Sequence, residues 1–166
     1  MRPCSWRESE MPADGVPASD RTLRRIAGVL ATIVAGIHLY WALPIAVRQL
    51  EFGILHDPRP AACLLATMAM LMGAILVVQG FDPLPVYVGG ILLLLVFLGG
   101  YAAWHTVLDH GAFWPGRHAH GHSELGPVRL VIVHLQDDSL ALASKLFEVA
   151  LLGVLSVLTI RELGDR

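Results

Sequence analysis

Charged side chains are scarce in this chain, and lysine is nearly absent. Only 16% of the 166 residues are charged, and Lys145 is the single lysine among 12 basic residues. A typical soluble domain carries about 25% charged residues. The net charge is −2 and the arginines form no basic tract, so the sequence does not predict nucleic-acid binding.

The chain is also poor in cysteine and lacks the short motifs of common enzyme classes. Its 2 cysteines, Cys4 and Cys63, stand far apart, which excludes a CxxC motif for zinc or thiol exchange. No P-loop, GxSxG, HExxH or CxxCH sequence occurs. The sequence leaves catalysis open but favours a protein that is not an enzyme.

Apolar side chains are abundant and make up 55% of the chain. A soluble fold of this size exposes too much of its surface to bury so many of them. They form runs of about 20 residues, the length that crosses a hydrocarbon core of about 30 Å. The runs predict an all-α, multi-pass protein of the cell membrane, with transmembrane helices at residues 26–47, 61–81, 84–108 and 139–160. We expect these helices to form an up-down bundle in the lipid bilayer.

Polar segments flank and join the predicted spans. Residues 1–20 lack any period, which predicts a disordered tail before a transmembrane domain at 21–163. Residues 109–126 form a loop rich in histidine. From Gly126 to Ile160 the chain would make a helix of roughly 50 Å, too long for one span. We therefore expect a short interfacial helix before the last span, which Asp138 or Ser139 would cap.

Arginine is distributed unevenly over the predicted topology. Five arginines flank the free ends of the first and last spans: Arg21, Arg24, Arg25, Arg161 and Arg166. The first and third loops carry Arg48, Arg59, Arg117 and Arg129, and the second loop carries none. The positive-inside rule then predicts cytoplasmic N- and C-termini and places the histidine-rich loop outside the cell.

Histidine is concentrated between residues 105 and 134. Neutral imidazole binds copper and zinc well, and nearby carboxylates can complete a site. The candidate metal ligands are His105, Asp109, His110, His118, His120, His122, His134 and Asp138. The HAHGH sequence at 118–122 is also explained by a solvated loop that binds metal without a role. Likewise, His105 and Asp109 can simply close the end of the third span.

Ionisable side chains inside the predicted spans are a second group of candidate functional residues. Lys145 and Glu148 lie about 9 and 14 Å from the start of the last span, counted from Ser139. Such groups are costly in a bilayer and usually face the bundle interior. On one continuous helix they would extend a polar stripe that begins at His134. A structural ion pair is the alternative to a functional one.

His38 has the matching depth in the first span. It lies about 12 Å from the outer face of a core of about 30 Å, level with Lys145 and Glu148. It is a candidate cofactor ligand, although a lone helix histidine is often a packed hydrogen-bond partner. The second predicted span contributes no polar group to this level.

Three segments carry a resemblance: HLYW at 38–41, YAAWHTVLDHG at 101–111 and LALASK at 140–145. In these segments the chain resembles small four-span membrane proteins of archaea, a resemblance that implies no activity.

Three functions fit these residues. The first is a copper- or zinc-binding membrane protein, which we favour at this stage. The second is an electron carrier with haem b bound through His38 and another helix histidine. The third is an accessory or transport subunit of a larger membrane complex or a homo-oligomer. In that case Lys145 and Glu148 would serve as a proton relay or a docking pair.

Overall fold

The computed structural model describes residues 18–53, 57–108 and 126–166, and this part of the chain is helical without strands. Its helices are α1 (Ala18–Phe52), α2 (Arg59–Val78), α3 (Pro83–His105), α4 (Pro127–Asp137) and α5 (Ser139–Gly164). Within these residues, 4 helices are long and apolar enough to cross a membrane: α1, α2, α3 and α5. The predicted four-span helical bundle is confirmed.

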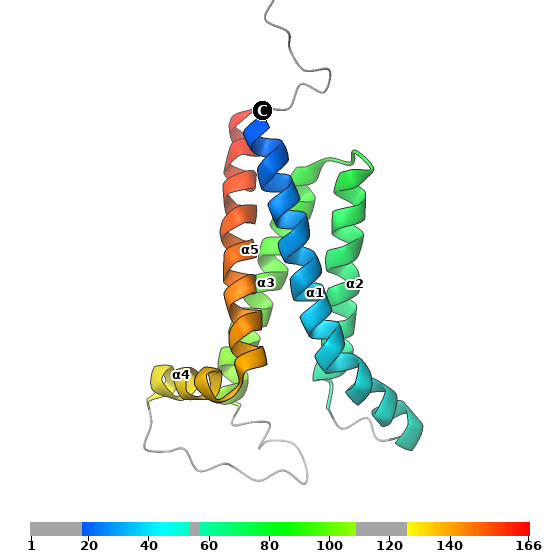
Figure 1. Cartoon of the computed structure of the whole chain (residues 1–166), viewed down its shortest axis with the longest axis vertical. Helices are drawn as coiled ribbons and strands as arrows, with labels where there is room; N and C mark the ends of the chain where they lie inside the picture. Colours follow the sequence, from blue (N-terminus) through cyan, green and yellow to red (C-terminus); the bar gives the residue numbers. More distant parts are fainter. Residues whose placement is uncertain (1–17, 54–56, 109–125) are drawn as a thin grey trace, which may run out of the picture.

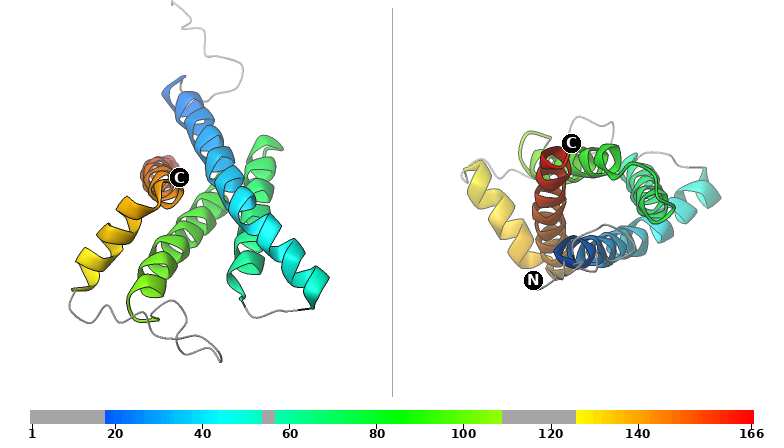
Figure 2. Two further views of the ribbon diagram at one scale, coloured as in Figure 1. Left: turned by 60° about the horizontal axis from the view of Figure 1, so that its bottom comes forward. Right: turned by 90° about the horizontal axis from the view of Figure 1, so that it is seen from above.

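The spanning helices run up and down and form a ring (Figure 1). Seen from above, α1 lies between α5 and α2, and α3 closes the ring on the opposite side (Figure 2). The start of α1 and the C-terminus lie at one end of the bundle. The short helix α4 lies across the other end, as expected for an interfacial helix. We call these the terminal end and the α4 end.

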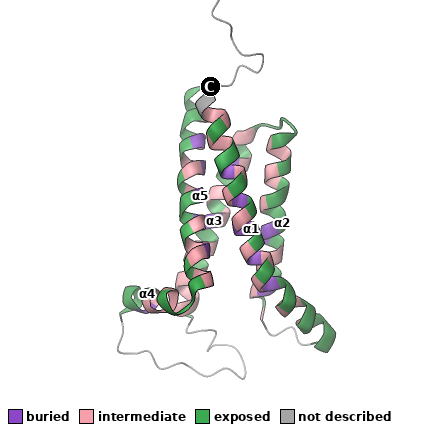
Figure 3. Ribbon diagram, in the orientation of Figure 1, coloured by how far each residue is buried: buried purple, intermediate pink, exposed green. Residues whose placement is uncertain are grey.

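Many residues on the outside of the bundle are exposed (Figure 3), and large apolar side chains are among them. Examples are Leu65, Val96, Leu146 and Ile160, whose relative exposures are 68%, 68%, 63% and 70%. Exposure of such an apolar surface to water is unfavourable, whereas lipid tails solvate it. The exposed apolar surface therefore supports insertion in a membrane.

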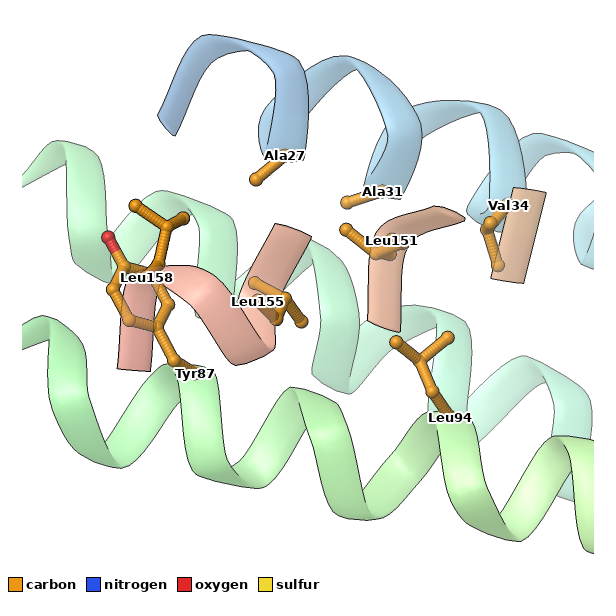
Figure 4. Close-up of a cluster of buried hydrophobic side chains, with 8 residues drawn as sticks. All are labelled: Ala27, Ala31, Val34, Tyr87, Leu94, Leu151, Leu155 and Leu158. Carbon is orange, nitrogen blue, oxygen red and sulfur yellow. The ribbon is translucent and has the colours of Figure 1, made fainter. Parts of the chain in front are cut away.

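The buried core lies between α1, α3 and α5 (Figure 4). Ala27 and Ala31 on α1 are small, so Leu151, Leu155 and Leu158 of α5 pack close to that helix. Such small residues let membrane helices approach each other.

Gly90 does the same for α3 and α5. A Cβ atom at Gly90 would lie 2.9 Å from Leu155 Cδ1, so a larger residue there would require the end of the Leu155 side chain to move. At Gly89, Gly99 and Gly100, which the sequence offers equally, an added Cβ meets nothing within 4 Å among the described residues. Close packing of α3 therefore depends on one of its four glycines.

The helix ends correct several predicted boundaries. α1 begins at Ala18, inside the predicted tail, and continues through Pro44 to Phe52. Its last turns lean away from the bundle (Figure 1). Pro44, which precedes these turns, is exposed. At the other end of the chain, α3 stops at His105, three residues short of 108.

The predicted polar stripe from His134 to Glu148 does not lie on one helix. The chain breaks at Asp138, whose extended backbone ends α4 and begins α5. Its carboxylate accepts hydrogen bonds from Leu140 N (2.9 Å) and Ala141 N (3.0 Å), so Asp138 caps α5. The stripe was wrong because this cap turns the chain, and α4 then lies across the bundle.

Ion pairs tie the helices together at the terminal end. Arg161 binds Asp20, and Arg24 binds Glu162 at 3.3 Å, so both pairs join α1 to α5. Asp82 caps α3 and binds Arg166. The hydrogen bond from Arg166, with that from Leu84 N, holds the pKa of the Asp82 carboxyl below its ordinary value.

Candidate functional site

Among the described residues, 4 polar side chains are buried: His38, Thr67, Ser144 and Glu148. Three of them meet in the middle of the bundle, where α5 faces α1. Together with Lys145 they form what we call the His38–Glu148 cluster. Burying a charge in lipid or protein is costly unless it is paired and hydrogen-bonded, so their contacts determine what the cluster can do.

Glu148 is the centre of the cluster and has no exposed surface (0%). Its Oε1 accepts a hydrogen bond from Ser144 Oγ at 2.8 Å, one helical turn away on α5. Lys145 Nζ lies 2.7 Å from both carboxylate oxygens. The carboxylate is therefore held by three short contacts, all from its own helix.

His38 approaches the same carboxylate from α1. Its Nδ1 lies 2.9 Å from Val34 O, and a carbonyl can only accept, so Nδ1 carries a hydrogen. Its Nε2 lies 3.5 Å from Glu148 Oε1. The ring also stacks on Phe97 of α3, with 4.3 Å between ring centroids. Three helices thus fix the imidazole with Nε2 directed at Glu148.

The charges of the cluster balance when His38 is neutral, because Lys145 and Glu148 cancel. In that state a lone pair on Nε2 faces a carboxylate oxygen, which is unfavourable. One more proton, placed on Nε2, converts this contact into a charge-assisted one. The geometry can therefore hold one exchangeable proton between His38 and Glu148.

A column of polar and aromatic side chains leads from the cluster to the α4 end. Lys145 Nζ lies 5.2 Å from the ring centre of Tyr101 on α3. The ring centroids of Tyr101 and His105 are 4.4 Å apart, as are those of His105 and His134 on α4. Phe97, Tyr101 and His105 follow at i, i+4 and i+8, so one face of α3 supplies this column.

The opposite side of the cluster is apolar. Val34, Leu94 and Leu151 are 0%, 0% and 1% exposed and come from α1, α3 and α5. Each lies about one helical turn nearer the terminal end than the residue of the same helix that forms the cluster or stacks on it: His38, Phe97 and Glu148 respectively. Figure 4 shows the three apolar side chains. This apolar layer separates the cluster from the terminal half of the bundle. Polar access is therefore one-sided.

The structure adds groups that the sequence reasoning missed. On α2, Cys63 lies within electrostatic reach of Lys145 and Glu148, and Thr67 is 2% exposed. Arg59, at the start of α2, stacks over Trp104 at 3.8 Å. The prediction that this span contributes no polar group was wrong. The spacing of four residues from Arg59 to Cys63 to Thr67 was the available signal, since it places them on one face.

Two of the predicted metal ligands are brought together. The ring centroids of His105 and His134 lie 4.4 Å apart with the rings tilted by 41°, and His134 Nδ1 lies 2.9 Å from Leu130 O. Asp138 instead caps α5. The other candidates, Asp109, His110, His118, His120 and His122, lie outside the described residues. Within the described residues, no group of 3 His, Cys, Asp or Glu side chains could hold a metal ion.

The surroundings of His38 do not fit a haem ligand. The hydrogen bond of Nδ1 to Val34 O would suit a ligand, but Nε2, the nitrogen left for iron, faces Glu148, and Phe97 covers the ring. An iron atom on Nε2 would have to take the place of the Glu148 carboxylate. The haem hypothesis therefore loses the residue on which it rested.

Comparison with protein families, with curated proteins and with solved structures gave no match to this chain.

Proposed function

We propose that this multi-pass membrane protein binds and passes on a proton inside the bilayer, as a transport protein or an accessory subunit of one. The observation that carries the proposal is the fully buried Glu148 carboxylate, held by Ser144 and Lys145 and 3.5 Å from His38 Nε2. An intramembrane carboxylate beside an imidazole is the usual composition of a proton relay.

The one-sided surroundings support this role over a purely structural ion pair. A structural pair needs Lys145 and Glu148 only. Here a histidine from another helix is oriented at the carboxylate, and exchangeable groups on Tyr101 and His105 continue to the α4 end. A proton can then reach the cluster from that end, while the apolar layer blocks the other.

The proposal includes an orientation and a setting. We place the protein in the cell membrane with both termini in the cytoplasm, because five arginines gather at the terminal end. The α4 end then faces outward and supplies the proton. The closed apolar layer blocks the passage of a proton to the terminal end. A larger complex or a homo-oligomer would therefore have to move this layer before the proton could leave the cluster on that side.

Infrared difference spectroscopy of the protein in vesicles tests the proposal. When the pH is changed between about 8 and 5, the range in which histidine charge commonly changes, we expect the carboxylate bands of Glu148 to shift, because His38 Nε2 gains a proton beside them. These bands should be missing in Glu148→Gln. They should remain in Glu51→Gln, which removes an exposed carboxylate of α1 instead.

Two results would count against the proton site. The spectra of wild type and Glu148→Gln could be identical over this pH range, which would leave a structural pair. Alternatively, the Glu148 bands could change equally in His38→Phe, a variant that keeps an aromatic ring against Phe97. In that case the imidazole would have no part in proton binding.

Metal binding at the α4 end is a second candidate, favoured by the close contact between the His105 and His134 rings. Two imidazoles from different helices make half of a four-ligand zinc site. The remaining ligands would have to come from Asp109, His110 or the histidines at 118–122. The metal would then act at the outer entrance of the polar column.

Zinc titration of the purified protein, followed by equilibrium dialysis and elemental analysis, separates the possibilities. A site at the α4 end predicts one bound zinc ion that is lost in His105→Ala and His134→Ala alike. If zinc is lost only when His118, His120 and His122 are replaced, the metal is held by the loop alone. Retention in all of these variants would exclude both sites.

A further inference from the structure

The terminal half of the bundle contains a large apolar cavity that the proton site does not use. Its volume is about 860 Å³, within the range of roughly 300–1,000 Å³ typical of small-molecule sites. All four spanning helices line it, and Leu94 and Leu151 form its inner end. The cavity and the His38–Glu148 cluster thus lie on opposite sides of the apolar layer.

Small side chains create this space. Ala27, Gly28 and Ala31 line it from α1, and Gly73 and Gly89 from the facing helices. A Cβ atom added at Gly28 or Gly89 would meet nothing within 4 Å among the described residues. The α1 and α2 ribbons also diverge towards the terminal end (Figure 1). Both helices line the cavity, which is half open to the outside of the bundle, so in a bilayer its opening would meet lipid chains.

Polar groups lie at the membrane-surface end of the cavity. Arg24 and Arg25, in the first turns of α1, both line it. Tyr87 is only 4% exposed, and its hydroxyl points away from α3 and is drawn beside Leu158 of α5 (Figure 4). Neither the Tyr87 hydroxyl nor Arg24 Nε has a hydrogen-bond partner among the described residues. Both groups are buried donors, and an acceptor is the partner that each needs.

We infer that this cavity binds one chain of an anionic phospholipid, with its phosphate at Arg24, Arg25 and Tyr87. The apolar walls match a hydrocarbon chain. From Tyr87 to Leu94 the cavity is about 10 Å deep, which is most of one leaflet of about 15 Å. Basic pockets between spanning helices on the cytoplasmic side are a known way to hold anionic headgroups.

Native mass spectrometry tests the inference after reconstitution into vesicles of equal parts phosphatidylglycerol and phosphatidylcholine. We expect one phosphatidylglycerol to remain on each wild-type chain after transfer to detergent. Gly28→Leu and Gly89→Leu, tested separately and together, fill the cavity and should lose this lipid. Gly36→Leu and Gly99→Leu are matched controls, because these glycines are exposed and lie outside the cavity. Both controls should keep it.

The headgroup is tested separately. Arg25→Gln should weaken the preference for phosphatidylglycerol roughly fivefold, the contribution of one basic side chain at an anionic surface. Arg48→Gln, an exposed arginine near the other end of α1, should not change it. Helix content measured by circular dichroism verifies that each variant is folded.

Three results would overturn the inference. Equal lipid retention in the filled and control variants would mean that lipid covers only the outer surface. Equal retention of both phospholipids, or a free fatty acid as the bound mass, would exclude the anionic phospholipid. Finally, a second protein copy that is released by Gly28→Leu and Gly89→Leu would make the cavity a dimer interface.

Discussion

Glu148→Leu is expected to lower the free energy of unfolding by about 3–5 kcal/mol, the usual cost of removing one partner of a buried ion pair. The substitution leaves the Lys145 ammonium, 14% exposed, without its carboxylate, and also removes the acceptor of the Ser144 hydroxyl. Reversible unfolding in mixed micelles, followed by circular dichroism, measures the change.

The matched control removes both charges at once. In the double variant Lys145→Met, Glu148→Leu we expect most of the lost stability to return, because no charge remains unpaired in the bundle. A Glu148→Leu variant as stable as wild type would mean that Lys145 reaches water without its partner. The carboxylate would then not be the buried centre described above.

Leu94→Ala is expected to have the second largest effect. Leu94 is fully buried between the cavity and the His38–Glu148 cluster. Loss of a buried leucine costs about 2–5 kcal/mol in soluble cores. We expect about 2 kcal/mol here, because lipid removes the hydrophobic driving force and leaves the lost packing contacts. The same unfolding experiment measures it.

Leu95 provides the comparison on the same helix. It is 49% exposed on the outside of the bundle, so Leu95→Ala should change stability far less. Leu94→Ala should also open the apolar layer, which predicts faster deuterium exchange of the His38 Nδ1 hydrogen from the terminal end. Equal effects of Leu94→Ala and Leu95→Ala on both readouts would mean that Leu94 is not part of a barrier between the cluster and the terminal end.

Most of the fold could be predicted from the sequence because spans are set by length and hydropathy. Runs of about 20 apolar residues leave few other structures possible in a membrane. The helix boundaries were less accurate: the first span was predicted at residues 26–47, whereas α1 runs from Ala18 to Phe52. The orientation of α4 across the bundle depends on the cap at Asp138, one of the two residues, with Ser139, that the sequence suggested as the cap of the last span.

The candidate site could be predicted only in part. Depth along the helices placed His38 level with Glu148, and their side chains are in contact. The depth of a residue along a helix does not show, however, which way that helix is rotated about its axis and so which side chains face the bundle interior. Ser144, Cys63 and the apolar layer therefore emerged only from the structure, and the stripe through His134 failed. Most of the loop histidines lie outside the described residues and stay predictions.

The ring nitrogens of His38 provide the most direct test of the central claim. Nitrogen-15 NMR of histidine-labelled protein in vesicles, with His38 assigned by comparison with His38→Phe, reports where the protons are. We predict that Nδ1 carries a hydrogen throughout and that Nε2 gains one as the pH falls, in a transition that Glu148→Gln alters and Glu51→Gln does not. The account would be contradicted if the proton sat on Nε2 in the neutral ring, or if neither nitrogen changed while the protein stayed folded.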